Sequence, residues 1–171
     1  MAAFDPAFIQ LGYVTADIDA AIAYFTRTAG ISEWLRWNDV AVEKMVDGAV
    51  ARSKLDLAMA WRGSTMLELI RPVSGAIGIY NLRGAGDSPV NLHHIGHGVP
   101  GDEADFERQL QTMEAAGQPV ALVTRNDNGN YALVDTRNTT GLYTEYLWGR
   151  DKGNALFASI PRNEIFHQAI A

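Results

Sequence analysis

The chain has 171 residues, enough for one domain with a sizeable core, and its 47% hydrophobic and 20% charged residues are typical of a folded globular protein. Its 14 Lys and Arg are scattered and outnumbered by 20 Asp and Glu, which argues against nucleic acid as a partner. There is no cysteine, so a metal site would use oxygen and nitrogen ligands. Because no apolar run approaches the roughly 20 residues that span a bilayer, and no signal-peptide pattern opens the chain, we expect a cytoplasmic protein that binds no membrane.

The first half of the sequence predicts a strand, a helix and then three strands. Apolar and small residues over 8–15 suit a buried strand. The helix that follows is capped by Asp17 or Asp19, and Gly30 supplies its left-handed end. The three strand-like runs cover 34–37, 49–61 and 65–70, with turn signals at 47–48 and 62–63.

The second half repeats this order after a connection over 73–89 that is rich in small residues and contains a short helical turn. A strand over 92–99 precedes a helix that begins near Asp102 and ends at Gly117. Strands near 120–125, 130–135 and 142–148 complete the repeat, with a hairpin turn at 127–129. The tail predicts short helices over 155–160 and 164–170, outside the repeat and at a subunit contact.

Two copies of one strand, one helix and three strands predict an α+β fold. We expect a single domain, 1–171, made of modules 8–72 and 91–148 and followed by a tail, 149–171. The duplication is clearest at 10–14 and 94–99, because these two segments have the same strand-like residue pattern.

Four polar side chains interrupt the apolar strands of the two modules. Glu68 and Glu145 each lie in the middle of an apolar or aromatic run, whereas Gln10 and His94 lie on the first strand of each module. A lone charge on a buried strand is costly, and a divalent cation held by all four side chains would remove that cost if the modules pack face to face. Small residues on the same strand faces leave room for a ligand.

Two of these residues have alternative roles. Glu68 is also compatible with an edge carboxylate that faces solvent or pairs with Arg71. A buried Gln10 is equally compatible with a hydrogen-bonded amide that contacts substrate, since a neutral amide oxygen is a weak ligand.

His93 is a rival to His94 for the site. Adjacent residues of a strand point to opposite faces, so only the register decides which imidazole enters the site. Alignment of the two modules selects His94, and this places His93 and His97 on the opposite, helix-covered face as structural histidines.

In these segments the chain resembles the vicinal oxygen chelate superfamily, which includes glyoxalase I, methylmalonyl-CoA epimerase, extradiol dioxygenases and bleomycin-resistance proteins. The segments are 9–14 (IQLGYV), 17–21 (DIDAA), 66–72 (MLELIRP), 92–96 (LHHIG), 134–137 (VDTR) and 141–146 (GLYTEY). The resemblance implies two βαβββ modules that form a curved, cup-like mixed sheet around a divalent metal. Its metal positions fall on Gln10, Glu68, His94 and Glu145.

Two departures narrow the resemblance to its epimerase-like branch. Residues 135–141 differ from the Asp-Pro-Asp-Gly form common in glyoxalase I. Extradiol dioxygenases hold iron with two histidines and one carboxylate, and Gln10 stands where the first histidine would fall, which disfavours ring cleavage.

The site then predicts an enzyme that abstracts a proton next to a carbonyl chelated by Zn, Ni, Co, Mn or Fe, as an epimerase, isomerase or lyase. Glu68 and Glu145 are its catalytic residues, either one acting as base. We expect a small-molecule substrate and a homodimer. The alternative is a metal-free protein that sequesters an apolar or aromatic compound in the same cup.

Overall fold

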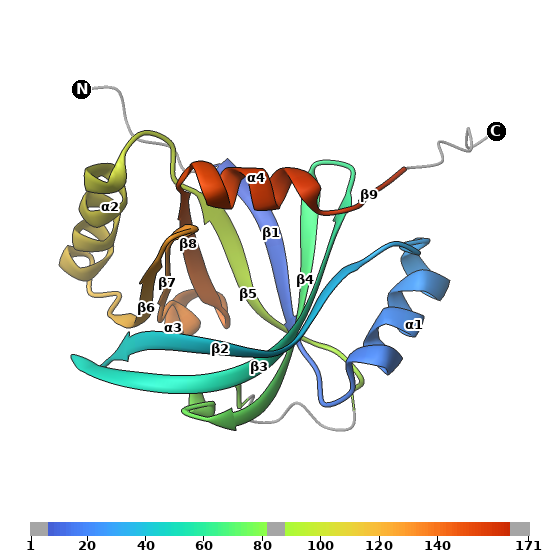
Figure 1. The fold of residues 1–171 in the computed structure, drawn as a ribbon. Coiled ribbons are helices and arrows are strands. Elements are labelled where there is room, and N and C mark those ends of the chain that lie inside the picture. Colours follow the sequence, from blue (N-terminus) through green and yellow to red (C-terminus); the bar gives the residue numbers. More distant parts are fainter. Residues whose placement is uncertain (1–6, 82–87, 165–171) are drawn as a thin grey trace.

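The computed structural model describes residues 7–81 and 88–164 and confirms the α+β order in both halves (Figure 1). The first module consists of β1 (Ala7–Val14), α1 (Ile18–Ala29), β2 (Leu35–Val46), β3 (Ala49–Arg62) and β4 (Thr65–Gly75). The second consists of β5 (Asn91–Gly98), α2 (Glu103–Ala115), β6 (Val120–Asn126), β7 (Gly129–Val134) and β8 (Tyr143–Gly149). The other elements are η1 (Gly78–Tyr80), α3 (Arg137–Thr140), α4 (Asp151–Ser159) and β9 (Arg162–Asn163).

The nine strands of the described residues form one mixed sheet, in the order β2-β6-β7-β8-β5-β1-β4-β3-β9. β1 and β5 pair in antiparallel fashion and join the two modules, and each pairs in parallel with the last strand of its own module, β4 or β8. β2 pairs with β3 and also meets β6 at Met45 and Val123. The curved sheet expected from the sequence is therefore confirmed, and this last contact closes it.

Helix α1 begins and ends where the sequence predicts. The side chain of Asp17 accepts hydrogen bonds from the backbone N–H groups of Asp19 and Ala20, and Gly30 ends the helix with a φ of 65°. The helix buries Ile18 and Phe25 against the outer faces of β3 and β4.

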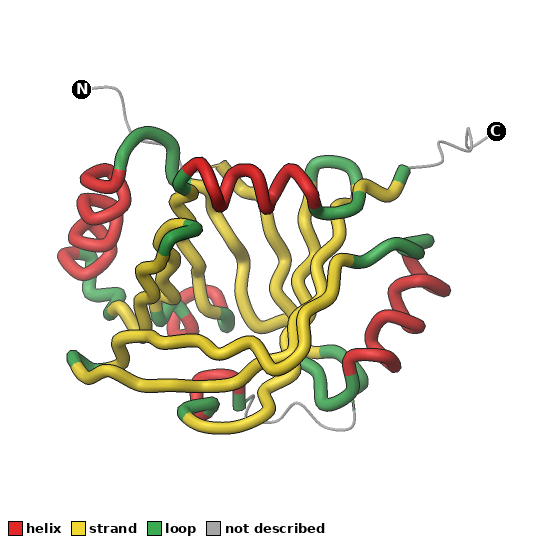
Figure 2. Tube along the Cα trace, viewed as in Figure 1, coloured by secondary structure: helices red, strands yellow, loops and turns green. Residues whose placement is uncertain are grey.

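Helix α2 starts with a capping box in which Asp102 and Asp105 each accept a hydrogen bond from the other's backbone N–H. Phe106 and Leu110 are buried against the second module's strands. The two long helices flank the sheet on opposite sides and leave its concave face free (Figure 2).

The segment after the repeat differs from the prediction. Helix α4 covers Asp151–Ser159 rather than 155–160; it follows the repeat, as expected, and crosses the opening of the curved sheet (Figure 1). Leu156 and Phe157 of this helix face the enclosed space, which explains why an apolar helix follows the last strand. Most of the second expected helix, 164–170, lies outside the described residues.

None of the helices in the described ranges is long and apolar enough to cross a membrane.

Strand β2 carries a buried lysine. Lys44 is 2% exposed, and its Nζ has no hydrogen-bond partner among the described residues. The ammonium lies 4.9 Å from the centre of the Tyr80 ring, and burial lowers the pKa of Lys44. Because desolvation penalises the charged form, this side chain reduces the stability of the fold at neutral pH.

Replacing Lys44 by methionine is expected to raise the free energy of unfolding at pH 7 by about 1–2 kcal/mol, since methionine fills similar space without a charge. The folded pKa lies below the unfolded value, so the unfolded wild-type chain binds more protons between the two pKa values. Wild-type stability should thus rise with pH in that window, and the advantage of Lys44→Met should shrink. Urea unfolding at several pH values measures both, with exposed Lys54→Met as the control. A loss of stability in Lys44→Met would show that the contact with Tyr80 outweighs desolvation.

Candidate metal centre

The four polar residues selected from the sequence lie together on the concave face of the sheet. Gln10 comes from β1, Glu68 from β4, His94 from β5 and Glu145 from β8. The His94 Nε2 atom lies 3.4 Å from Glu68 Oε2 and 3.3 Å from Glu145 Oε2. The Gln10 amide nitrogen donates to the same two carboxylate oxygens, at 2.8 and 3.2 Å respectively. One chain thus supplies all four side chains.

Two glycines create the space in which these side chains meet. In the register of the sheet, Gly12 lies between Glu68 and His94, and Gly96 lies between Gln10 and Glu145. A Cβ on Gly12 would fall 1.9 Å from His94 Cε1, and one on Gly96 would fall 2.7 Å from Gln10 Cβ. The small residues therefore make room for the side chains of the site itself, rather than for a ligand as the sequence suggested.

The prediction for His93 is wrong, because strand β5 contains a bulge. Gly12 pairs with His94 and Tyr13 pairs with Leu92, which leaves His93 as an extra residue without a partner on β1. Both imidazoles consequently lie on the concave side, with their Nδ1 atoms 3.0 Å apart. His97, beyond the bulge, packs against Tyr146 on the face covered by α2, as predicted.

Charge interactions set the protonation of the two imidazoles. Burial lowers the pKa of His94, but the carboxylates of Glu145 and Glu68 outweigh burial and raise it to about 10. Burial and the neighbouring His94 lower the pKa of His93 to about 3, so that ring is neutral. Burial also raises the pKa of Glu145, although His94 opposes the shift.

The structure does not bear out the alternative in which Glu68 pairs with Arg71. Arg71 forms an ion pair with Asp56 instead. Within the described residues, neither Glu68 nor Glu145 has a lysine or arginine as an ion-pair partner. Two buried carboxylates therefore face one protonated imidazole and, among the described residues, no lysine or arginine.

This donor set fits a divalent cation. Ligand atoms of Glu68, His94 and Glu145 all lie within 4.8 Å of one another. The Gln10 Oε1 atom is buried and has no hydrogen-bond partner among the described residues. Rotation of the amide by half a turn would bring this oxygen to the centre as a fourth ligand, and amide oxygen and nitrogen are assigned only from their hydrogen bonds. Oxygen and imidazole ligands suit zinc, nickel, cobalt, manganese and iron.

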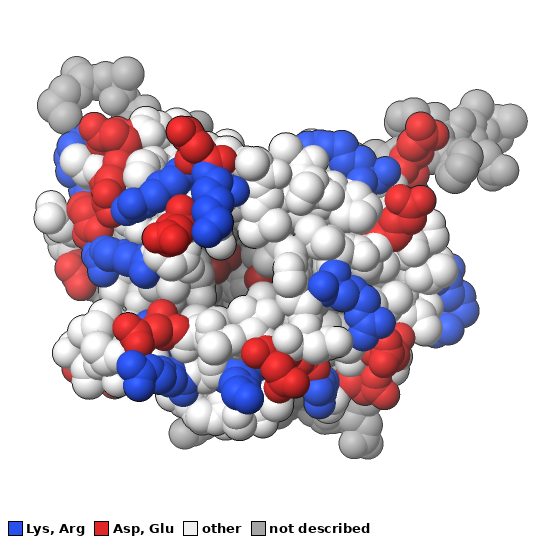
Figure 3. Space-filling model, in the orientation of Figure 1, with Lys and Arg blue, Asp and Glu red and all other residues white. Residues whose placement is uncertain are grey.

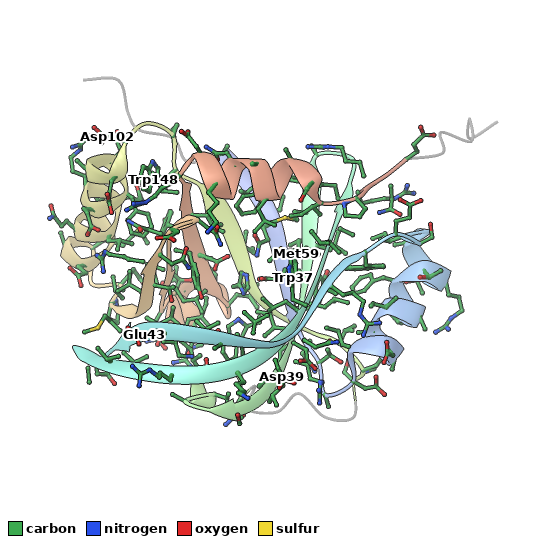
Figure 4. All side chains as sticks on the ribbon, viewed as in Figure 1. Trp37, Asp39, Glu43, Met59, Asp102 and Trp148 are labelled. Carbon is green, nitrogen blue, oxygen red and sulfur yellow. The ribbon has the colours of Figure 1, made fainter. Side chains whose placement is uncertain are left out.

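The cluster forms the floor of a cavity of 690 Å³. Figure 3 shows this face hollowed between α4 and the β2–β3 pair, with acidic atoms at the bottom of the hollow. Trp37 and Met59, from the neighbouring strands β2 and β3, lie in the middle of the view in Figure 4. Together with Leu156 and Phe157 of α4 they give the cavity an apolar wall.

Two tyrosines on the cavity wall were not selected from the sequence. Tyr80 of η1 and Tyr131 of β7 line the cavity, and burial raises the pKa of each phenol, assisted by the charges of Glu68 and Glu145. Both phenols therefore stay protonated and can donate a hydrogen bond to an oxygen of a bound molecule. An isolated tyrosine in the sequence gave no signal of such a role.

Replacing Gly12 by alanine is expected to displace His94, because the added Cβ would overlap its ring. We expect the free energy of unfolding to fall by about 1–3 kcal/mol and bound metal to be lost. Gly78→Ala is the matched control, since its Cβ would meet nothing within 4 Å. Urea unfolding and elemental analysis measure both effects, and a Gly12→Ala protein with wild-type stability would contradict the geometry.

Metal binding is expected to release about one proton per ion at pH 7.5. The pKa of His94 near 10 keeps its ring protonated in the metal-free chain, and a ligand must offer a lone pair. The affinity should therefore increase with pH up to about 10. Calorimetry of Zn²⁺ binding in two buffers of different ionisation enthalpy measures the release, and a heat independent of the buffer would contradict it.

Comparisons with known proteins agree with this fold. Methylmalonyl-CoA epimerase from Mycobacterium tuberculosis has 15% identity and a TM-score of 0.55, covering 91% of this chain and 96% of that one. A hypothetical protein from Bacillus halodurans C-125 has 14% identity and a TM-score of 0.57, covering 86% and 96%. A variant of Streptomyces coelicolor methylmalonyl-CoA epimerase in complex with 2-nitronate-propionyl-CoA has 16% identity and a TM-score of 0.55, covering 86% and 97%.

A comparison with curated protein sequences finds no match. The profile of the Glyoxalase/Bleomycin resistance protein/Dioxygenase superfamily matches residues 9–133. Because this match spans well over half of the chain, the protein belongs to that superfamily.

Proposed function

We propose that the chain is a divalent-metal-dependent enzyme that removes a proton from the carbon next to a carbonyl group of a small molecule, as an epimerase, isomerase or lyase. The observation that carries the proposal is the buried Glu68, His94 and Glu145 cluster, whose two carboxylates have no lysine or arginine partner among the described residues. These three residues would hold the metal, with Gln10 as fourth ligand. The bound metal would act as a Lewis acid toward the carbonyl oxygen.

The two glutamates are proposed as the acid and the base. Burial raises the pKa of Glu145, which brings this carboxyl closer to neutral pH, where proton exchange is efficient. Glu68 lies across the centre on the other module's parallel strand, so the two carboxyls can serve opposite sides of one carbon. Such an arrangement suits removal of a proton by one carboxylate and its return by the other.

The cavity supports a substrate with an apolar body. Its volume of 690 Å³ lies within the range of small-molecule sites, and its wall is largely aliphatic and aromatic. The protonated phenols of Tyr80 and Tyr131 would donate to substrate oxygens near the carboxylates. Proteins of the same fold include methylmalonyl-CoA epimerase, which acts on an acyl-CoA. In this chain α4 covers part of the cavity.

The first test is the metal content of the protein purified without added metal. Elemental analysis is expected to find about one divalent ion per chain. No bound metal, together with no binding of added Zn²⁺, Ni²⁺, Co²⁺, Mn²⁺ or Fe²⁺, would overturn the proposal in favour of a metal-free binding protein for apolar compounds.

The second test separates catalysis from folding. Glu68→Gln and Glu145→Gln are each expected to lower the rate of proton exchange by at least about a hundredfold while the chain still folds, because an amide cannot accept the proton. Exchange of the C–H next to the carbonyl of methylmalonyl-CoA and of an aromatic α-hydroxyketone, followed by NMR in D₂O, measures the rate. The exposed Glu114→Gln is the matched control. Wild-type rates in both active-site variants would contradict the assigned roles.

A further inference from the structure

We propose that His93 is a positioning residue that holds the neighbouring His94 with its Nε2 lone pair directed at the metal centre. The inference rests on the proposed metal site. It is carried by a line of two contacts, in which the Ile79 carbonyl oxygen lies 3.0 Å from His93 Nε2, and His93 Nδ1 lies 3.0 Å from His94 Nδ1.

The Ile79 carbonyl oxygen fixes the direction of both hydrogen bonds. A backbone carbonyl can only accept, so His93 Nε2 donates to Ile79. In a neutral imidazole the other nitrogen is then an acceptor, so His93 Nδ1 accepts the N–H of His94 Nδ1. Because His94 Nδ1 keeps its proton, the proton that His94 loses when it binds a metal comes from Nε2, the atom that faces Glu68 and Glu145.

The surroundings keep the His93 ring from turning. It is 1% exposed and lies between the rings of Tyr80 and Tyr143, at centroid distances of 5.5 and 4.9 Å. The bulge in β5 brings it to the concave side; without the extra residue, regular alternation would place it on the outer face. The local backbone is therefore arranged so that both nitrogens of His93 are used.

Packing alone does not account for a histidine at this position. Phenylalanine would fill the same flat space between Tyr80 and Tyr143, but it offers neither the donor for Ile79 nor the acceptor for His94. The nitrogens of His93 can thus be tested separately from its bulk. Partners that orient a metal-binding imidazole typically contribute 10- to 100-fold to metal affinity.

The main test is the affinity of the metal-stripped protein for Co²⁺, measured from the visible absorption of the bound ion in competition with a chelator. His93→Phe is expected to bind Co²⁺ 10- to 100-fold more weakly than the wild-type chain. His93→Gln, whose amide oxygen can accept from His94, should recover part of the loss. His97→Phe, on the outer face of the same strand, should bind like wild type.

A second measurement needs no variant and so does not depend on the folding of one. In the Zn²⁺-loaded wild-type chain labelled with ¹⁵N-histidine, NMR should show His94 with a proton on Nδ1 and none on Nε2.

The outcomes separate this inference from the proposed function. Tight Co²⁺ binding that is unchanged in His93→Phe, or a Zn²⁺-loaded wild type with the proton on His94 Nε2, would overturn the role of His93 and leave the metal-dependent function intact. A wild-type chain that takes up neither ion would overturn both.

Discussion

The antiparallel pairing of β1 with β5 is the constraint on which the site depends. It joins the two modules and sets the register in which Gly12 lies beside His94 and Gly96 beside Gln10. Each glycine lies between two polar side chains on the neighbouring strands. Because glycine has no Cβ, those two side chains can approach each other over it. A shift of this register by one residue would turn the polar side chains to the outer face, where α1 and α2 pack.

Electrostatics explains why a bound cation would stabilise a cluster of this kind. At an effective dielectric of about 20, the imidazolium of His94 attracts each carboxylate at 3.3–3.4 Å by about 5 kcal/mol. Repulsion between Glu68 and Glu145, within 4.8 Å, is at least about 3 kcal/mol, and desolvation adds several kcal/mol for each of three buried ions. One proton on His94 therefore offsets only part of the cost, whereas a divalent cation attracts both carboxylates with twice the charge.

Local patterns made the fold and the four polar residues predictable. The caps of α1 and α2 and the turn at 47–48 are each decided by neighbouring residues, and a carboxylate in an apolar strand is visible without knowledge of its partners. The bulge at His93, the contact of β2 with β6 and the place of α4 depend on strands far apart in sequence. Side-chain alternation along β5 placed His93 on the wrong face. The bulge is visible only when β5 is paired with β1, so the sequence of β5 alone does not reveal it.

The charged floor and the apolar wall of the cavity come from different sets of elements. The central strands β1, β4, β5 and β8 are related by the duplication and supply the charged floor, so its geometry is constrained by pairing on both sides. The apolar wall comes from the flanking strands of both modules, β2, β3 and β7, together with η1 and α4, which lie outside the repeat. Leu156 and Phe157 line the cavity from α4, so changes in this helix would alter the shape of the cavity without changing the strands that carry the glutamates. The charged floor thus comes from the central strands of the repeat, and α4 covers it from outside the repeat.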